Sequence, residues 1–177
     1  MIDITLNYFT HAFNRMGKIT ITSEFISYRN DLSDKFNDYG RTKDKKIRCA
    51  DGLLPEFLIL KNEMADAPKN RKSDFYLNHM YIDNKMINEE ANTVTIPNRK
   101  TQWMKDAVIS KDLTHFMVTK WKTRPEECKG DNGRALQEGD VVEFEIITIL
   151  PAREALKSLT DSIWYADSKY FWANSVH

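Results

Sequence analysis

The segment that most constrains the fold of this chain is residues 139–150, GDVVEFEIITIL, which Pro151 follows directly. A Gly-Asp turn precedes alternating apolar and polar residues, and the segment ends in an unbroken apolar run from Ile146 to Leu150. Alternation with a period of two is typical of a β-strand, and the apolar end indicates burial on both faces. Proline has no N–H to donate to a sheet but suits the first turn of a helix. We therefore expect a buried strand that ends in a turn, from which the last helix starts.

Length and charge restrict the class of protein. The chain has 177 residues, enough for one domain with a core, and its 41% apolar and 29% charged residues are typical of a soluble globular chain. Because 26 basic residues balance 26 acidic ones, any nucleic-acid contact needs a local basic patch. There is no apolar run near 20 residues, so we expect no membrane contact. Cys49 and Cys128 lack CxxC spacing, which favours a cytoplasmic protein with reduced thiols.

In the first half of the chain, the patterns predict strands and one clear helix. Alternation within residues 2–8 and 18–22 predicts two strands able to form a wide hairpin. Apolar residues three and four apart predict a helix over residues 24–39, with Thr22 or Ser23 as its cap. The apolar run in residues 56–61 predicts a short buried strand, whereas residues 75–82 fit either a strand or a helix.

In the second half, strands and helices alternate. Residues 83–92 are polar and fit a helix or a loop, and residues 93–96 form a short β-like piece. Residues 98–110 predict a short amphipathic helix, and residues 113–121 predict a strand. Helical spacing of apolar residues continues through residues 152–172.

This order of elements predicts an α+β fold, with a small mixed or mostly antiparallel sheet packed by helices. We expect residues 1–150 to form a single domain and residues 151–177 to form a C-terminal aromatic helix. That helix either packs on the domain or serves as an interface, because aromatic residues concentrate in protein–protein contacts. Its aromatic residues are Trp164, Tyr165, Tyr170, Phe171 and Trp172.

Familiar catalytic motifs are absent from the sequence. No glycine-rich loop of the kind that cradles phosphates or dinucleotides is present, and no GxSxG segment occurs. The four histidines are isolated and lack the spacing of zinc ligands.

Basic stretches that lie near aromatic residues are the first candidate for function. They are residues 43–48, residues 69–72, Arg99-Lys100 near Trp103, and residues 120–124 around Trp121. Such a combination could hold a phosphate backbone and stack on exposed bases. The same pattern also fits solvated loops beside core tryptophans.

Aspartates beside these stretches are the second candidate. Two or three carboxylates that converge in space can hold Mg²⁺ for phosphodiester hydrolysis. Taken singly, each aspartate fits a helix cap or a surface charge equally well. The four residues are Asp74, Asp83, Asp106 and Asp112.

Much of residues 2–150 resembles the RusA-type Holliday-junction resolvases. Ile4-Thr5-Leu6, Asn14-Arg15, Gly17–Glu24 and Tyr28-Arg29 resemble that family's first strand, Asn-Arg turn, second strand and helix. Further along, residues 57–64 followed by 70–74 resemble a strand, a basic loop and the first acidic position of the family. Asp112 with Val118-Thr119-Lys120 resembles a later acidic position and a strand that ends in lysine. Residues 139–149 resemble the closing strand.

The resemblance implies a dimeric, Mg²⁺-dependent endonuclease that acts on branched or single-stranded DNA. It implies catalytic roles for Asp74, Asp112 and Lys120, and metal-ligand roles for Asp74, Asp112 and Asp83. The nucleic-acid contacts that it implies are Arg15, Lys18, Arg71, Lys72, Arg99 and Lys100.

The family's Asp-x-Asp-Asn pair is absent here, because Phe75, Tyr76 and Leu77 follow Asp74. Asp83-Asn84-Lys85 is a displaced equivalent of that pair. The sequence therefore fits an active nuclease or a catalytically degenerate relative that still binds nucleic acid. The alternative from another class is a non-enzymatic, phage-type protein that sequesters or inhibits a host component, with its C-terminal helix as the protein-binding surface.

Overall fold

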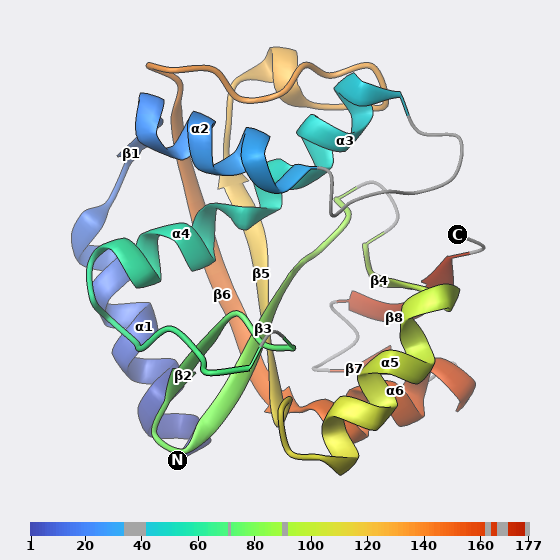
Figure 1. The fold of residues 1–177 in the computed structure, drawn as a ribbon. Helices are drawn as coiled ribbons and strands as arrows, with labels where there is room; N and C mark the ends of the chain where they lie inside the picture. Colours follow the sequence, from blue (N-terminus) through green and yellow to red (C-terminus); the bar gives the residue numbers. More distant parts are fainter. Residues whose placement is uncertain (34–41, 71, 90–91, 162–163, 166–169, 176–177) are drawn as a thin grey trace.

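The computed structural model describes residues 1–33, 42–70, 72–89, 92–161, 164–165 and 170–175. A five-stranded mixed sheet with the order β1-β6-β5-β3-β2 runs through the middle of the molecule (Figure 1), and a three-stranded sheet has the order β4-β8-β7. This arrangement confirms the α+β class with a mixed sheet. The strands are β1 (Ile19–Thr20), β2 (Phe75–Leu77), β3 (Met80–Met86), β4 (Thr93–Pro97), β5 (His115–Thr123), β6 (Val141–Pro151), β7 (Trp164–Tyr165) and β8 (Tyr170–Ser175).

Helices cover the larger sheet and support the smaller one. Among the described residues, none of them combines the length and the apolar character that crossing a membrane requires. The helices are α1 (Ile2–Met16), α2 (Ser23–Leu32), α3 (Lys43–Ala50), α4 (Leu54–Lys61), α5 (Asn98–Ile109) and α6 (Ala152–Asp161), with short 3-10 turns η2 (Asp51–Leu53) and η3 (Glu126–Cys128).

The strand expected in residues 139–150 is present as β6, between β1 and β5 in the larger sheet. It pairs antiparallel with β5 on one side and with β1 on the other. Pro151 is its last residue and α6 begins at Ala152, so the expected helix follows the strand, but without the expected turn between them. Strand β5 also pairs in parallel with β3, which places the β2–β3 hairpin at the edge of the sheet.

Two apolar clusters hold the sheet and helices together. The first joins the sheet to α1, α2 and α4 and includes Phe9, Phe25 and Phe57. The second joins β5 and β6 to α5, α6, β4 and β8. Its largest member is Trp172, which is fully buried with its ring centroid 5.1 Å from that of Phe116.

The strands predicted in residues 2–8 and 56–61 are wrong, because both segments are helical. In α1 the buried residues are Thr5, Phe9 and Phe13, at helical spacing, so tertiary packing decides against the apparent alternation. In α4, apolar residues surround the helix and all but its last turn is buried. A short apolar run has no period that distinguishes a buried strand from a buried helix.

Helix α2 begins where the sequence indicates. The Thr22 hydroxyl oxygen accepts a hydrogen bond from the backbone N–H of Phe25, as expected of a cap. The predicted helix over residues 24–39 is described as far as Leu32, and residues 34–41 lie outside the described part. The predicted wide hairpin is wrong, since β1 pairs with β6.

The aromatic helix predicted through residue 172 is not confirmed. Helix α6 occupies Ala152–Asp161, whereas Trp164–Tyr165 and Tyr170–Ser175 are strands. Strand β8 pairs in parallel with β4, with Val94 opposite Trp172. Trp172, which we expected on a helix that either packs on the domain or forms an interface, therefore completes a core from a strand.

A buried ion pair connects α2 to the chain before α4. The Arg29 guanidinium donates to Asp51 Oδ1 over 2.9 Å, and the side chains of Arg29 and Asp51 are 6% and 2% exposed. Asp51 Oδ2 accepts the backbone N–H of Leu136 over 2.9 Å, and Arg29 also donates to the Leu136 carbonyl oxygen. One pair of charges thus joins α2, η2 and the loop before β6.

Replacing Asp51 by alanine is expected to lower the free energy of unfolding by about 3–5 kcal/mol, because the Arg29 charge would stay buried without its partner. Urea denaturation followed by circular dichroism measures this. The control is Glu24→Ala, which breaks the exposed pair with Lys61 and should cost less than about 1 kcal/mol. Equal losses in the two variants would contradict the role of the buried pair.

Candidate functional site: a carboxylate cluster beside the β2–β3 hairpin

The β2–β3 hairpin brings two aspartates and a lysine together. Phe75 pairs with Ile82, so Asp74, one residue earlier, lies opposite Asp83. The Asp74 backbone N–H donates to the Ile82 carbonyl oxygen over 2.8 Å, which extends the pairing to this residue. Asp83 and Lys85 are two residues apart on β3 and therefore point to the same side. Lys85 Nζ lies 3.1 Å from Asp83 Oδ2.

A third carboxylate comes from α4, which the sequence led us to expect as a strand. Glu56 lies in the first turn of this helix and is 6% exposed. Its Oε1 accepts the Tyr28 hydroxyl over 2.8 Å. The Asp74 carboxyl group lies within hydrogen-bonding reach of both Asp83 and Glu56. We call Glu56, Asp74, Asp83 and Lys85 the carboxylate cluster.

The backbone holds Asp74 in place. The N–H of Asn84, between Asp83 and Lys85, donates to Asp74 Oδ2 over 2.7 Å. The Asn84 side-chain oxygen accepts the hydroxyl of Thr119, a fully buried residue of β5. The position of the Asp74 carboxylate is therefore set by strand pairing and does not depend on a flexible loop.

Burial and like charge make the cluster electrostatically costly. Burial raises the pKa of Asp74 well above its ordinary value, and the negative charges of Asp83 and Glu56 raise it further. Burial alone favours the neutral amine of Lys85, but Asp83, Asp74 and Glu56 together raise its pKa, so it carries a positive charge. If all four groups ionise, the cluster carries two more negative charges than positive ones.

The charge and chemistry of the cluster match a hard divalent cation. Mg²⁺ takes oxygen ligands, commonly one or two carboxylates with water and substrate phosphate, and two positive charges would neutralise the cluster. Within the described ranges, no group of three or more His, Cys, Asp or Glu side chains is arranged to hold a metal ion, so a cation here would rely on one or two carboxylates together with water. A cation beside these carboxyl groups would offset the repulsion that raises the pKa of Asp74.

Solvent reaches the cluster in spite of its burial. The side chains of Asp83 and Lys85 are 14% and 22% exposed, whereas Glu56 lies deeper. A phosphate group could therefore approach from the side of Asp83 and Lys85. The phenol of Tyr28 donates a hydrogen bond to Glu56. Burial is the main cause that raises the pKa of Tyr28, and the negative charge of Glu56 raises it further, so the phenol stays a neutral donor.

The structure places the remaining expected acidic and catalytic residues elsewhere. Asp112 lies in the turn between α5 and β5, where its Oδ2 accepts the Ser110 hydroxyl over 2.9 Å. The β5 residue paired with Asp83 is Phe116. Lys120 is in register with Glu145 of β6, and Lys85 is the lysine that meets Asp74 and Asp83. Asp106 is on α5 and accepts from Gln102.

The basic residues expected to bind nucleic acid are spread over the molecule. Arg15 and Lys18 are exposed beside β1, at the opposite edge of the sheet from β2. Lys72 precedes Asp74 by two residues, and Arg71 lies outside the described residues. Arg99 and Lys100 are in the first turn of α5. Of the described set, Lys72 is the one next to the cluster in sequence.

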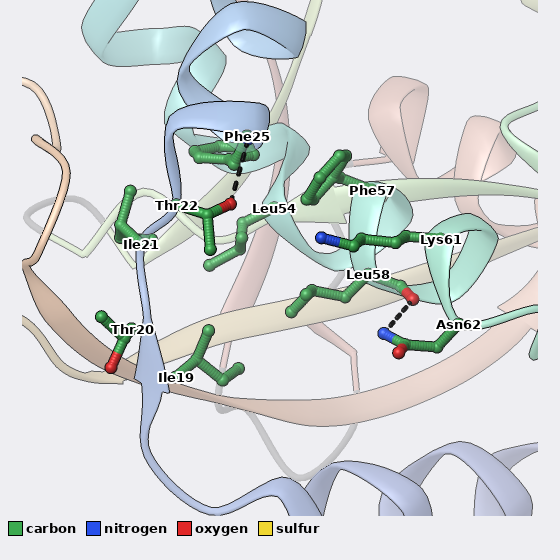
Figure 2. Close-up of a pocket in the computed structure, with 10 residues that line it drawn as sticks. All are labelled: Ile19, Thr20, Ile21, Thr22, Phe25, Leu54, Phe57, Leu58, Lys61 and Asn62. Atoms are coloured by element: carbon green, nitrogen blue, oxygen red, sulfur yellow. Dashed lines mark hydrogen bonds between the residues drawn. The ribbon is translucent and has the colours of Figure 1, made fainter.

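An apolar cavity of about 150 Å³ lies between β1, α2 and α4 (Figure 2). Its lining includes Ile21, Phe25 and Leu54, and its one charged group is Lys61, which pairs with Glu24. This cavity lacks the acidic and basic groups that hydrolysis requires, and the carboxylate cluster is therefore the candidate for chemistry.

Glu56 and Lys85 are the two members of the cluster that sequence analysis does not single out. Lys85 follows Asp83 by two residues, which is the spacing that places both on one side of a strand. Glu56 is one acidic residue beside the apolar run Phe57–Leu60. Both features are present in the sequence. They place Lys85 and Glu56 beside Asp74 only once residues 80–86 are known to be a strand and residues 54–61 a helix.

Comparisons of the chain with protein-family models, with curated proteins and with solved structures find no match. Function must therefore be argued from the geometry of the site.

Replacing Asp74 by asparagine is expected to raise the melting temperature at pH 7 in EDTA, by roughly 2–4 °C for each kcal/mol of repulsion removed. The folded-state pKa of Asp74 is raised, so the cost of ionising it appears as the pH rises above its ordinary value of 3.8. The two proteins should therefore converge near pH 3.5. Asp112→Asn serves as the control and should change little. A lower melting temperature for Asp74→Asn at pH 7 would contradict this electrostatic account.

Proposed function

We propose that this chain is a metal-dependent nuclease that hydrolyses phosphodiester bonds at the carboxylate cluster. The observation that carries the proposal is the meeting of three carboxylates and a protonated lysine on β3, α4 and the residue before β2. Groups that strongly perturb one another's pKa values concentrate at functional sites. If all four groups ionise, the excess of two negative charges has no evident structural benefit, but it matches a divalent cation.

Each member of the cluster has a role in this proposal. Asp74 and Asp83 would hold Mg²⁺, and Glu56 would complete the site from α4. When bound, the cation would polarise the phosphate and lower the pKa of a water molecule. The Lys85 ammonium, 3.1 Å from Asp83, is placed to stabilise negative charge that develops on the phosphoryl oxygens.

The same cluster favours the active form over the catalytically degenerate one. The resemblance to RusA-type resolvases leaves one acidic position unfilled in sequence, next to Asp74. Asp83 lies opposite Asp74 across the hairpin, and Glu56 adds a third carboxylate from a helix. In this proposal, those positions would supply the ligands that Mg²⁺ needs.

Under this proposal the substrate is branched or single-stranded DNA, and the protein is a cytoplasmic homo-oligomer. Zero net charge makes the bulk attraction to DNA weak, so binding relies on local cations such as Lys72 and Lys85. The binding constant should then fall as the salt concentration rises. The slope of its logarithm against the logarithm of the salt concentration should be shallow, because few phosphates are contacted.

Purified protein is expected to cleave labelled branched or single-stranded DNA in Mg²⁺ and not in EDTA. Asp74→Asn and Lys85→Met should each lower the cleavage rate by about 100-fold or more, because each removes a charged group that contacts the reacting phosphate or its metal. Asp112→Asn is the matched control and should keep wild-type activity. Denaturing gel electrophoresis of the products measures the rates.

A second measurement separates loss of metal binding from loss of folding. Mg²⁺ should raise the melting temperature of the wild-type protein, since a ligand bound only by the folded state stabilises it. The Asp74→Asn protein should stay folded and show no such rise. Absence of cleavage by the wild-type protein, or cleavage by Asp74→Asn at the wild-type rate, would overturn the proposed function.

A further inference from the structure

Two tyrosines lie next to the carboxylate cluster on the β2–β3 hairpin. Tyr76 and Tyr81 are directly opposite each other, and their ring centroids are 4.6 Å apart with an interplanar angle of 45°. Tyr76 follows Asp74 by two residues and Tyr81 precedes Asp83 by two. Because strand side chains alternate, the tyrosine pair points to the same side as the two aspartates, about 7 Å along the hairpin.

The tyrosine pair is not needed to pack the hairpin on the core. Neither ring belongs to the two apolar clusters, and both residues are half-buried. The residues that pack on the core alternate with the tyrosines and point to the other face of the hairpin. Phe75 and Ile82 are fully buried, and Met80 is 3% exposed. A cross-strand contact between the rings adds some stability to the hairpin, but that does not require half-buried tyrosines.

The backbone holds both rings in place. The N–H of Tyr81 donates to the Thr114 hydroxyl oxygen over 2.9 Å, and its carbonyl oxygen accepts the Thr114 N–H over 2.9 Å. On the other side, Tyr76 exchanges two backbone hydrogen bonds with Asp66, of 2.8 and 2.9 Å. A ligand that stacks on the rings would therefore pay little to order them.

We propose that the tyrosine pair is a stacking surface for the base next to the phosphodiester bond that is cleaved. This inference rests on the proposed nuclease function and names its substrate class. One step of two residues along the strand separates the rings from the carboxylates, which is comparable with the separation of a phosphate and the base of an adjoining nucleotide. Aromatic side chains bind bases of any sequence in this way, since every base has a π-face.

Stacking on a side chain requires a base that is free of its neighbours in the helix. In continuous duplex DNA the base faces are covered by adjacent base pairs, and exposing one costs unstacking energy. The surface therefore selects strands with unpaired nucleotides at the cut: single strands, flaps, or the unpaired nucleotides of branched DNA. An intact duplex lacks the group that the tyrosines bind.

The test measures binding in EDTA, where no strand is hydrolysed. Fluorescence anisotropy of a labelled 20-nucleotide single strand and of its duplex gives the two dissociation constants. Tyr76→Leu and Tyr81→Leu should each weaken single-strand binding roughly tenfold and change duplex binding less than twofold. Tyr76→Phe and Tyr81→Phe keep the ring and should bind as the wild type does. Unchanged single-strand binding in the leucine variants would overturn the proposal.

A second measurement needs no variant. A single strand that carries 5-iodouracil is irradiated with the wild-type protein in EDTA, and the cross-linked peptide is identified by mass spectrometry. Cross-links to Tyr76 or Tyr81 support the stacking surface, and cross-links confined to other segments overturn it. If the wild type cleaves DNA but the tyrosines make no difference, the nuclease stands and the surface fails. If no DNA is cleaved while the tyrosines still govern single-strand binding, the nuclease fails and the stacking surface remains.

Discussion

Two neighbouring side chains of α2 fix the segment from Asp51 to Glu56, which carries the third carboxylate of the cluster. Arg29 pairs with Asp51 beneath the surface, and Tyr28 donates to Glu56. Asp51 begins η2 and Glu56 lies in the first turn of α4, so both ends of this short segment are attached to one helix. The position of the third carboxylate therefore depends on an ion pair that has no direct part in chemistry. Such a pair is costly to bury but strongly directional, which suits a role in positioning.

The carboxylate cluster also shows that the fold keeps like charges together at a cost in stability. Three carboxyl groups around one ammonium repel one another in a partly dry environment, and the fold keeps them together by backbone pairing of the hairpin and by packing of α4. A protein selected only for stability would place apolar side chains there. The surplus charge makes sense if a cation or a phosphate-bearing substrate completes the balance during function.

The elements that the sequence predicts correctly are those in which one apolar–polar period continues over the whole element. Strand β6, strand β5, helix α5 and the Thr22 cap all follow from local patterns. It failed for α1 and α4, where short apolar runs fit two periods and tertiary packing decides. The site was recovered in part: Asp74 and Asp83 were named, but Glu56 and Lys85 depend on a helix and a strand that the sequence did not separate. Asp83-Asn84-Lys85 is polar although it belongs to β3, so it lacks the apolar alternation by which a sequence indicates a strand.

The parallel pairing of β4 with β8 has a consequence for synthesis of the chain. Val94 and Ile96 are fully buried, but the strand beside them is translated long after they leave the ribosome. Until Trp172 arrives, the second apolar cluster lacks its largest member, and β4 presents an open edge to solvent. The nascent protein thus passes through a period in which chaperones and proteases can bind that edge.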